Sequence, residues 1–180
     1  RFELEVQTIR ELQGVPGVMP ILSSAAEPDM ARLWYSMPIA KLSADELSGC
    51  ESDVAVRFVH DIAVTLAEVH SQGVSHRDLK PSNLYAVGGR PTVGDFGLTK
   101  VVASDLDLTG LHEKVGPAYF IAPEMLRTDA AVNPMAADVY SLMKCLWCFI
   151  SGHRFPPLGP HRPQDPHTAL AAPGYVPNVD

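Results

Sequence analysis

A short stretch near the middle of the chain carries the side chains best suited to chemistry. It reads His76-Arg77-Asp78-Leu79-Lys80-Pro81-Ser82-Asn83, and Asp95-Phe96-Gly97 and Ala122-Pro123-Glu124 follow it along the chain. Carboxylate and amide oxygens are the hard ligands that Mg²⁺ prefers. A lysine can neutralise phosphate charge. These residue types therefore suit phosphoryl transfer, which needs positioned charges more than covalent catalysis.

Each motif is weak evidence by itself. An Arg-Asp pair is usually a surface ion pair of small energy, a single Asp-Phe-Gly is usually a turn, and a lone histidine such as His76 is usually structural. Their joint occurrence in this order and spacing reverses those expectations. In these motifs the chain resembles the protein kinase family.

The resemblance implies a role for each polar residue of the motifs. Asp78 matches the carboxylate that positions or deprotonates the substrate hydroxyl, and Lys80 matches the cation that steadies the γ-phosphate. Asn83 and Asp95 match the two magnesium ligands. ATP and Mg²⁺ are the implied cofactors, and Ser or Thr hydroxyls of a protein substrate are the implied acceptors.

The N-terminal residues supply further candidates for the ATP site. Residues 1–13 place apolar side chains roughly on one helical face, so we expect a helix there. By the resemblance this is the αC helix, whose Glu5 pairs with a strand lysine that holds the ATP phosphates, although a helix glutamate is often merely solvated. Met37 matches the start of the hinge to the larger lobe. Glu5 and Met37 are therefore expected at the ATP site.

The resemblance also implies a hydrophobic stack beside the site. Its expected members are Ile9, Leu22, His76 and Phe96. Asp138 matches the aspartate that caps the backbone of the 76–83 segment from behind, so it should fix Asp78 in place.

Periodicity and turn residues predict the elements that hold these groups. Strands are expected at Val18–Leu22 and Leu33–Met37, with a turn around residues 27–29. Residues 43–46 have a capping-box pattern. Two adjoining apolar stripes predict that a helix over 53–72 is largely buried. Small hairpins are expected over 74–98.

The last part of the chain should contain one central helix. Residues 138–151 are apolar nearly all round, and the Pro- and Gly-rich chain after Ser151 shows no further helix.

The segment from Asp95 to Glu124 matches the activation segment of kinases. Because Arg77 precedes Asp78, the resemblance implies that a phosphorylated residue orders this segment. Thr109 is our candidate for that residue, with an ordinary solvated threonine as an equal alternative. Pro117 stands where serine/threonine kinases usually have threonine, which puts the substrate-facing geometry in question.

Composition narrows the class of protein. The 180 residues carry a formal charge of −7 without a Lys/Arg cluster, so nucleic acid or an anionic membrane is not an expected partner. No apolar run approaches the ~20 residues of a membrane span, so we expect no membrane insertion by this segment. Cys145 and Cys148 lie in an apolar stretch and read as core residues rather than metal ligands. The low cysteine count suits a reducing compartment, hence a cytoplasmic domain, whose parent protein could still be anchored elsewhere.

The predicted fold is α+β, protein-kinase-like, with two lobes. Residues 1–37 form a remnant of the small lobe, and residues 38–180 form an incomplete, mostly helical large lobe. The Gly-rich loop and the ATP lysine are not found in the sequence, so this segment alone is expected to be poorly active or inactive.

The expected activity is that of a serine/threonine protein kinase, most similar to bacterial ones. The alternative is a pseudokinase-like binding or regulatory scaffold, which typically lacks one of the residues matched by Asp78, Lys80, Asn83 and Asp95. A kinase for small molecules is a weaker option, because such relatives normally lack Ala-Pro-Glu.

Overall fold

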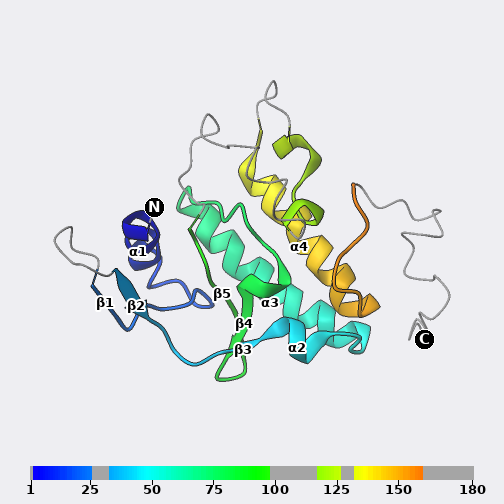
Figure 1. The fold of residues 1–180 in the computed structure, drawn as a ribbon, viewed down its shortest axis with the longest axis horizontal. Coiled ribbons are helices and arrows are strands. Elements are labelled where there is room, and N and C mark those ends of the chain that lie inside the picture. Colours follow the sequence, from blue (N-terminus) through cyan, green and yellow to red (C-terminus); the bar gives the residue numbers. More distant parts are fainter. Residues whose placement is uncertain (1, 26–32, 98–116, 127–131, 160–180) are drawn as a thin grey trace.

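The computed structural model describes residues 2–25, 33–97, 117–126 and 132–159. Helix α3 (Ser52–Ser71) and helix α4 (Pro134–Ser151) pack against each other near the centre of the molecule (Figure 1). Helix α1 (Phe2–Glu11) lies beside a two-stranded sheet at one end. The expected turn at 27–29 and most of the activation segment, including Thr109, fall outside the described residues.

Two small antiparallel sheets accompany the helices. Strands β1 (Ser23–Ala25) and β2 (Trp34–Ser36) pair with each other. The second sheet has the order β3-β4-β5, formed by strands that run over Lys41–Leu42, Leu84–Val87 and Arg90–Val93. Gly88 and Gly89 join β4 to β5 with φ values of 57° and 81°. Such positive angles favour glycine and give the tight hairpin turn that the sequence predicted over 74–98.

The first predicted strand was misplaced. Instead of a strand over 18–22, the structure has one isolated parallel bridge from Val18 to Val93, and the strand begins at Ser23. Pro20 has no N–H to donate to a ladder. Val18, Met19 and Ile21 are nevertheless buried, so this segment packs along the sheet without joining it as a strand. The second predicted strand was correct and corresponds to β2.

The core lies between α3, α4 and the β4–β5 hairpin. Helix α3 buries one face, made of Ala55, Val59, Ile62, Leu66 and Val69. Val54 and Val64 stay 40% and 58% exposed, so the prediction of a largely buried helix was wrong. Within the described residues, the buried face takes side chains from both predicted stripes, and the rest of each stripe stays partly or fully exposed.

Helix α4 begins earlier than predicted because its N-terminus is well capped. The Asn133 side chain accepts hydrogen bonds from the N–H groups of Met135 (3.0 Å) and Ala136 (3.3 Å), and Pro134 occupies the first turn. Gly152 ends the helix in the left-handed conformation.

The predicted capping box at residues 43–46 was wrong. Strand β3 leads directly into helix α2 (Ser43–Leu47), so the N-cap residue is Leu42 and Ser43 is already inside the helix. The Ser43 hydroxyl is buried and has no hydrogen-bond partner among the described residues. A further short 3₁₀ helix, η5 (Pro123–Leu126), contacts α4.

The cysteine prediction was correct. Cys145 and Cys148 are unbonded core residues of α4, 0% and 4% exposed. Burial raises the pKa of the Cys145 thiol well above its usual value and raises that of Cys148 to about 12. Both thiols are therefore protonated packing groups at neutral pH.

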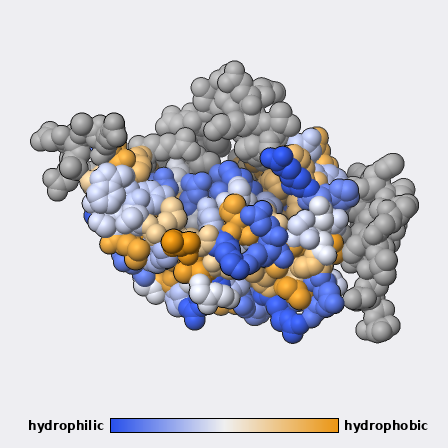
Figure 2. Space-filling model, turned by 60° about the horizontal axis from the view of Figure 1, so that its bottom comes forward, coloured by the Kyte–Doolittle hydropathy of each residue, from blue (hydrophilic) through white to orange (hydrophobic). Residues whose placement is uncertain are grey.

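None of the described helices combines the length and apolar character needed to cross a membrane. Exposed apolar side chains do occur near the two-stranded sheet, where Leu22, Trp34 and Ile39 are 66%, 48% and 100% exposed. Figure 2 shows apolar surface in separate patches on the face turned toward the viewer.

Helix α4 also buries a cation, Lys144, which is 3% exposed. Its Nζ donates hydrogen bonds to the carbonyl oxygens of Pro157 (2.6 Å) and Gly159. The ammonium also lies 5.3 Å from the centre of the Tyr140 ring. Burial lowers the pKa of Lys144 to about 8. The lysine thus ties the chain after α4 to the central helix.

This buried lysine predicts a pH effect on stability. Between pH 8 and 10.5 the unfolded chain binds the lysine proton and the folded chain does not. The free energy needed to unfold α4 therefore rises with pH in this range. Amide hydrogen exchange in α4, followed from pH 7.5 to 10, should show this rise in wild type and lose it in Lys144→Met. Lys41→Met is the control, because Lys41 pairs with Glu46 at the surface. Parallel profiles for wild type and Lys144→Met would contradict the assignment.

Candidate active site

Three of the predicted site residues meet through their side chains. Lys80 Nζ donates to Asp78 Oδ2 at 2.6 Å. Asn83 Nδ2 donates to the Asp78 carbonyl oxygen at 2.8 Å and to Asp78 Oδ2 at 3.2 Å. The Asp78 and Lys80 side chains are 20% and 24% exposed, so the pair sits at the surface of the core and remains accessible. A short 3₁₀ helix, η1 (Pro81–Asn83), turns Asn83 back toward Asp78.

The backbone of this segment is anchored from behind by Asp138. Its carboxylate accepts hydrogen bonds from the N–H groups of His76 and Arg77, each at 2.7 Å. Asp138 is 1% exposed and also contacts His70 Nε2 at 2.9 Å. The carboxylate is thus compensated by three polar partners, as a buried charge requires. The expectation that Asp138 caps this backbone was correct.

Arg77 adopts a conformation that needs such support. Its φ is 65°, in the left-handed region that non-glycine residues rarely occupy. The hydrogen bond from Arg77 N to Asp138 holds this turn, which leads directly into Asp78. Strain of this kind persists where the surrounding structure determines it.

His76 links the 76–83 segment to the 94–97 segment. It is fully buried, its Nε2 lies 2.9 Å from the Gly94 carbonyl oxygen, and its ring packs on Phe96 with centres 4.7 Å apart. Gly94 N in turn donates to the Asn83 carbonyl oxygen at 3.0 Å. The two motifs are therefore neighbours in space, and the expected packing of His76 on Phe96 was correct.

One expected member of the hydrophobic stack does not belong to it. Ile9 and Phe96 are buried in the same core cluster, but Leu22 is 66% exposed. The reason is the shift of strand β1, which turns Leu22 outward. The adjacent Ile21, 7% exposed, is the residue that joins the core.

Asp95 and Met37 line one small cavity. It has a volume of about 140 Å³ and is also lined by Ile9, Met19, Pro20, Ile21, Tyr35, Tyr85 and Gly94. Asp95 is exposed, with φ at 62°, another left-handed non-glycine residue. Burial, together with the nearby Asp95 carboxylate, raises the pKa of Tyr85. Two of the residues predicted at the ATP site thus share this cavity with tyrosine side chains.

Glu5 points toward the same region but has an unpredicted partner. The Tyr35 hydroxyl donates to Glu5 Oε1 at 2.9 Å. Burial and this contact with Glu5 raise the pKa of Tyr35. A Cβ atom at Gly97 would lie 3.1 Å from Glu5 Oε2, so glycine at that position lets the carboxylate approach the Asp95 segment. Within the described residues Glu5 forms no ion pair with a lysine or arginine.

The donor set fits a magnesium nucleotide. The Asn83 amide nitrogen donates to the Asp78 carbonyl oxygen, and the amide oxygen, which accepts one hydrogen bond from Ser82 Oγ at 3.4 Å, has a second lone pair for a hard cation. The exposed Asp95 carboxylate supplies a second oxygen donor. No cluster of three or more His, Cys, Asp or Glu exists in the described ranges. Mg²⁺ usually takes one or two protein carboxylates plus substrate phosphates, and Asn83 and Asp95 offer donors of this kind.

Sequence reasoning missed two residues that hold this site. Tyr35 lies on β2 two positions before Met37, which directly follows that strand, so the alternation of side chains in the predicted strand over 33–37 could have placed both on one face. His70 lies in the last turn of α3, and nothing in its local pattern indicates a contact with Asp138.

Comparison with known proteins identifies related sequences. The family described as protein kinase domain matches residues 2–167. The serine/threonine-protein kinase AfsK of Streptomyces griseus is 32% identical over 155 residues, covering 85% of this chain and 19% of that protein. The DNA damage-responsive serine/threonine-protein kinase RqkA of Deinococcus radiodurans is 32% identical over 154 residues, covering 82% of this chain and 23% of that protein.

A plant relative matches at similar identity. CBL-interacting protein kinase 20 of Oryza sativa is 36% identical over 165 residues, covering 85% of this chain and 35% of that protein. The chain thus spans about a fifth to a third of the length of these curated relatives. The matches confirm the kinase resemblance and the predicted fold class.

The anchoring by Asp138 predicts a stability effect. Asp138→Ala removes the acceptor of two buried N–H groups, which should cost about 1–3 kcal/mol for each group left unsatisfied. Calorimetry should show a melting temperature lower by several degrees, since 1 kcal/mol corresponds to about 2–4 °C for a domain of this size. Asp61→Ala, an exposed position on α3, should leave the transition unchanged. An unchanged transition in Asp138→Ala would contradict the anchoring.

Proposed function

The chain belongs to the protein kinase family, and from this premise we propose that the protein containing it is a serine/threonine kinase. It transfers the γ-phosphate of Mg-ATP to Ser or Thr hydroxyls of a protein substrate. The observation that carries the proposal is the contact of Asp78, Lys80 and Asn83 on a backbone fixed by Asp138. Relatives that are named serine/threonine-protein kinases support it.

In this proposal each of the three side chains has a separate task. The Asp78 carboxylate accepts a hydrogen bond from the acceptor hydroxyl and orients its oxygen. The Lys80 ammonium donates to Asp78 Oδ2, so it lies next to the place of the acceptor hydroxyl. From there it stabilises the negative charge of the phosphate that approaches this hydroxyl. Asn83 holds the Asp78 backbone through its amide nitrogen and offers its oxygen to the metal. Magnesium, when bound, would neutralise the phosphate charge.

Glu5, Asp95 and Met37 complete the proposed ATP site. Asp95 serves as the second metal ligand, and Met37 lines the cavity that it shares with Asp95. Glu5 supports the phosphates indirectly. Because its described partner is the Tyr35 hydroxyl and not a lysine, we expect these 180 residues alone to transfer phosphate poorly. Positioning of this kind can supply about 7–11 kcal/mol of a barrier.

Further proposals concern organisation and location. We place the boundary between a small-lobe part and a large-lobe part after residue 37, where α1 and the two-stranded sheet give way to the α3–α4 unit (Figure 1). Three unbonded cysteines suit a reducing compartment, so the domain is proposed to act in the cytoplasm. Thr109 stays a predicted regulatory phosphosite.

The proposal predicts the effect of removing the carboxylate of Asp78. In the full-length protein, Asp78→Asn should lower kcat for phosphorylation of a generic protein substrate by about 100-fold or more, because the hydroxyl loses its acceptor. Asp53→Asn, exposed on α3, is the matched control and should retain activity. Transfer of ³²P from labelled ATP measures both.

Two results would contradict the proposal. A wild-type kcat in the Asp78→Asn protein would show that Asp78 does not act on the acceptor hydroxyl. A wild-type protein that binds ATP but transfers no phosphate to any protein would favour the pseudokinase-like scaffold.

A further inference from the structure

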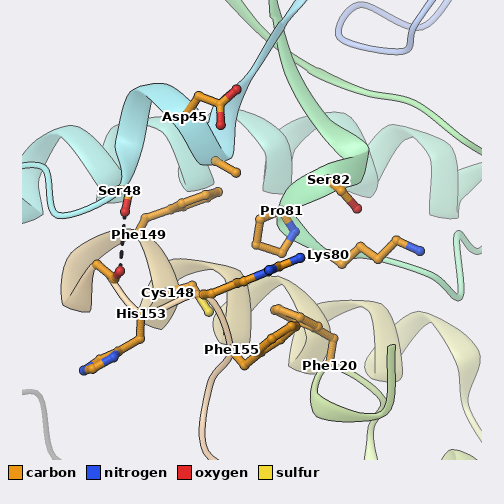
Figure 3. Close-up of a pocket in the computed structure, with 13 residues that line it drawn as sticks. Asp45, Ser48, Lys80, Pro81, Ser82, Phe120, Cys148, Phe149, His153 and Phe155 are labelled. Atoms are coloured by element: carbon orange, nitrogen blue, oxygen red, sulfur yellow. Dashed lines mark hydrogen bonds between the residues drawn. The ribbon is translucent and has the colours of Figure 1, made fainter. Parts of the chain in front are cut away.

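A larger cavity lies beside the Asp78–Lys80 pair, and of the residues assigned to the chemistry above only Lys80 lines it. Its volume is about 650 Å³, within the usual range for ligand sites. Three regions of the chain line it, namely helix α2, the 80–82 segment, and the chain from Cys148 to Phe155 with Phe120 beside it. Figure 3 shows these residues facing one another from the three sides.

Three phenylalanines form the apolar part of the cavity wall. Phe120 and Phe149 are 5% and 1% exposed, and Phe155 is 38% exposed. Pro81 and the Cys148 side chain also line it. Such a surface can accept a large apolar side chain, because burial gains about 25 cal/mol per Å².

The residues that line the cavity include two cations, Lys80 and Arg154, and one carboxylate, Asp45. Arg154 lines it and is exposed, with its guanidinium carbon 5.2 Å from the centre of the Phe155 ring. Phe155 stacks in turn on Tyr119 at 5.2 Å, so the arginine rests on an aromatic stack. Within the described residues no carboxylate forms an ion pair with Arg154.

The other ionisable residues of the cavity are Lys80, His153 and Asp45. Lys80 is engaged with Asp78, and its ammonium points away from the middle of the cavity (Figure 3). The His153 ring stacks on Trp147 at 5.5 Å and also turns outward. Asp45 is the one carboxylate among the lining residues, and Figure 3 shows it at the far edge on α2.

We propose that this cavity binds the protein substrate beside its acceptor hydroxyl and that Arg154 selects an acidic residue there. The segment it fits carries a large apolar side chain for the phenylalanine walls and an Asp or Glu for the guanidinium. Arginine suits this task because its planar donors match a carboxylate. The proposal rests on the proposed kinase function, since it takes Asp78 as the place of the acceptor.

The position of the cavity limits which substrate residues can reach it. The lining begins at Lys80, whose Nζ is 2.6 Å from the Asp78 carboxylate. An extended peptide advances about 3.3 Å per residue. The selected residues should therefore lie near the acceptor in the peptide sequence.

The test uses the full-length protein and a positional peptide library around a central serine. Asp, Glu, Lys and Ala are scanned over four positions on either side, with a phenylalanine at a neighbouring position. At one or two positions we expect kcat/KM to be about tenfold higher for the acidic than for the basic peptide. That ratio corresponds to about 1.4 kcal/mol, and it should fall at high salt.

Charge reversal identifies the residue responsible. Arg154→Glu should abolish or reverse the preference at those positions while the melting temperature stays near wild type. Arg90→Glu, at the exposed start of β5 and outside the cavity, makes the same charge change and should leave the preference intact. A wild-type enzyme without charge preference, or an Arg154→Glu variant that keeps it, would overturn the proposal.

A binding measurement separates this proposal from the proposed function. If no peptide is phosphorylated, the kinase proposal fails. Fluorescence anisotropy of the same labelled peptides then tests whether the cavity binds peptide at all. Binding of the acidic phenylalanine peptide that is lost in Arg154→Glu would uphold the peptide site. Absence of such binding, or binding unaffected by the substitution, would overturn it.

Discussion

The carboxylate of Asp138 is the interaction on which the site depends. It lies on the buried face of α4 and accepts hydrogen bonds from His76 N and Arg77 N, so the central helix and the 76–83 segment cannot move separately. Those bonds hold Arg77 at a positive φ, and the chain that leaves this turn carries Asp78 toward Lys80 and Asn83. The hydrogen bonds to this buried carboxylate fix the orientation of the loop backbone as well as its distance from α4, whereas a hydrophobic contact fixes no orientation.

The rest of the core supports this anchor from two sides. His76 reaches the Gly94 carbonyl oxygen and packs on Phe96, which brings the Asp95 segment beside the anchored loop. On the opposite side, Lys144 binds the carbonyl groups of Pro157 and Gly159, so the chain that follows α4 lies back along the helix. The cavity lined by Arg154 exists because that chain turns back at Gly152. Helix α4 thus supports both the proposed catalytic residues and the cavity proposed to select the substrate.

The sequence predicted the elements whose signals are local or belong to a family motif. Helices α1, α3 and α4 followed from periodicity, and the β4–β5 hairpin followed from short apolar runs separated by turns. The neighbourhood of Asp78, Lys80 and Asn83 followed from the resemblance to the kinase motifs. The exact strand over 23–25 could not, because Pro20 and the burial of Ile21 outweigh the strand propensity of 18–22. The burial of α3 was overestimated because periodicity shows which residues are apolar but not which faces find a partner. Contacts such as Tyr35 with Glu5 and His70 with Asp138 are long-range, and one sequence carries no signal for them.

The most direct test of this account is a crystal structure of the full-length protein with Mg²⁺ and a non-hydrolysable ATP analogue. The account predicts a metal ion bound by the Asn83 amide oxygen and the Asp95 carboxylate, with the Asp138 hydrogen bonds to His76 and Arg77 intact. A nucleotide whose metal touches neither Asn83 nor Asp95 would contradict it, as would a complex in which the loop has left Asp138.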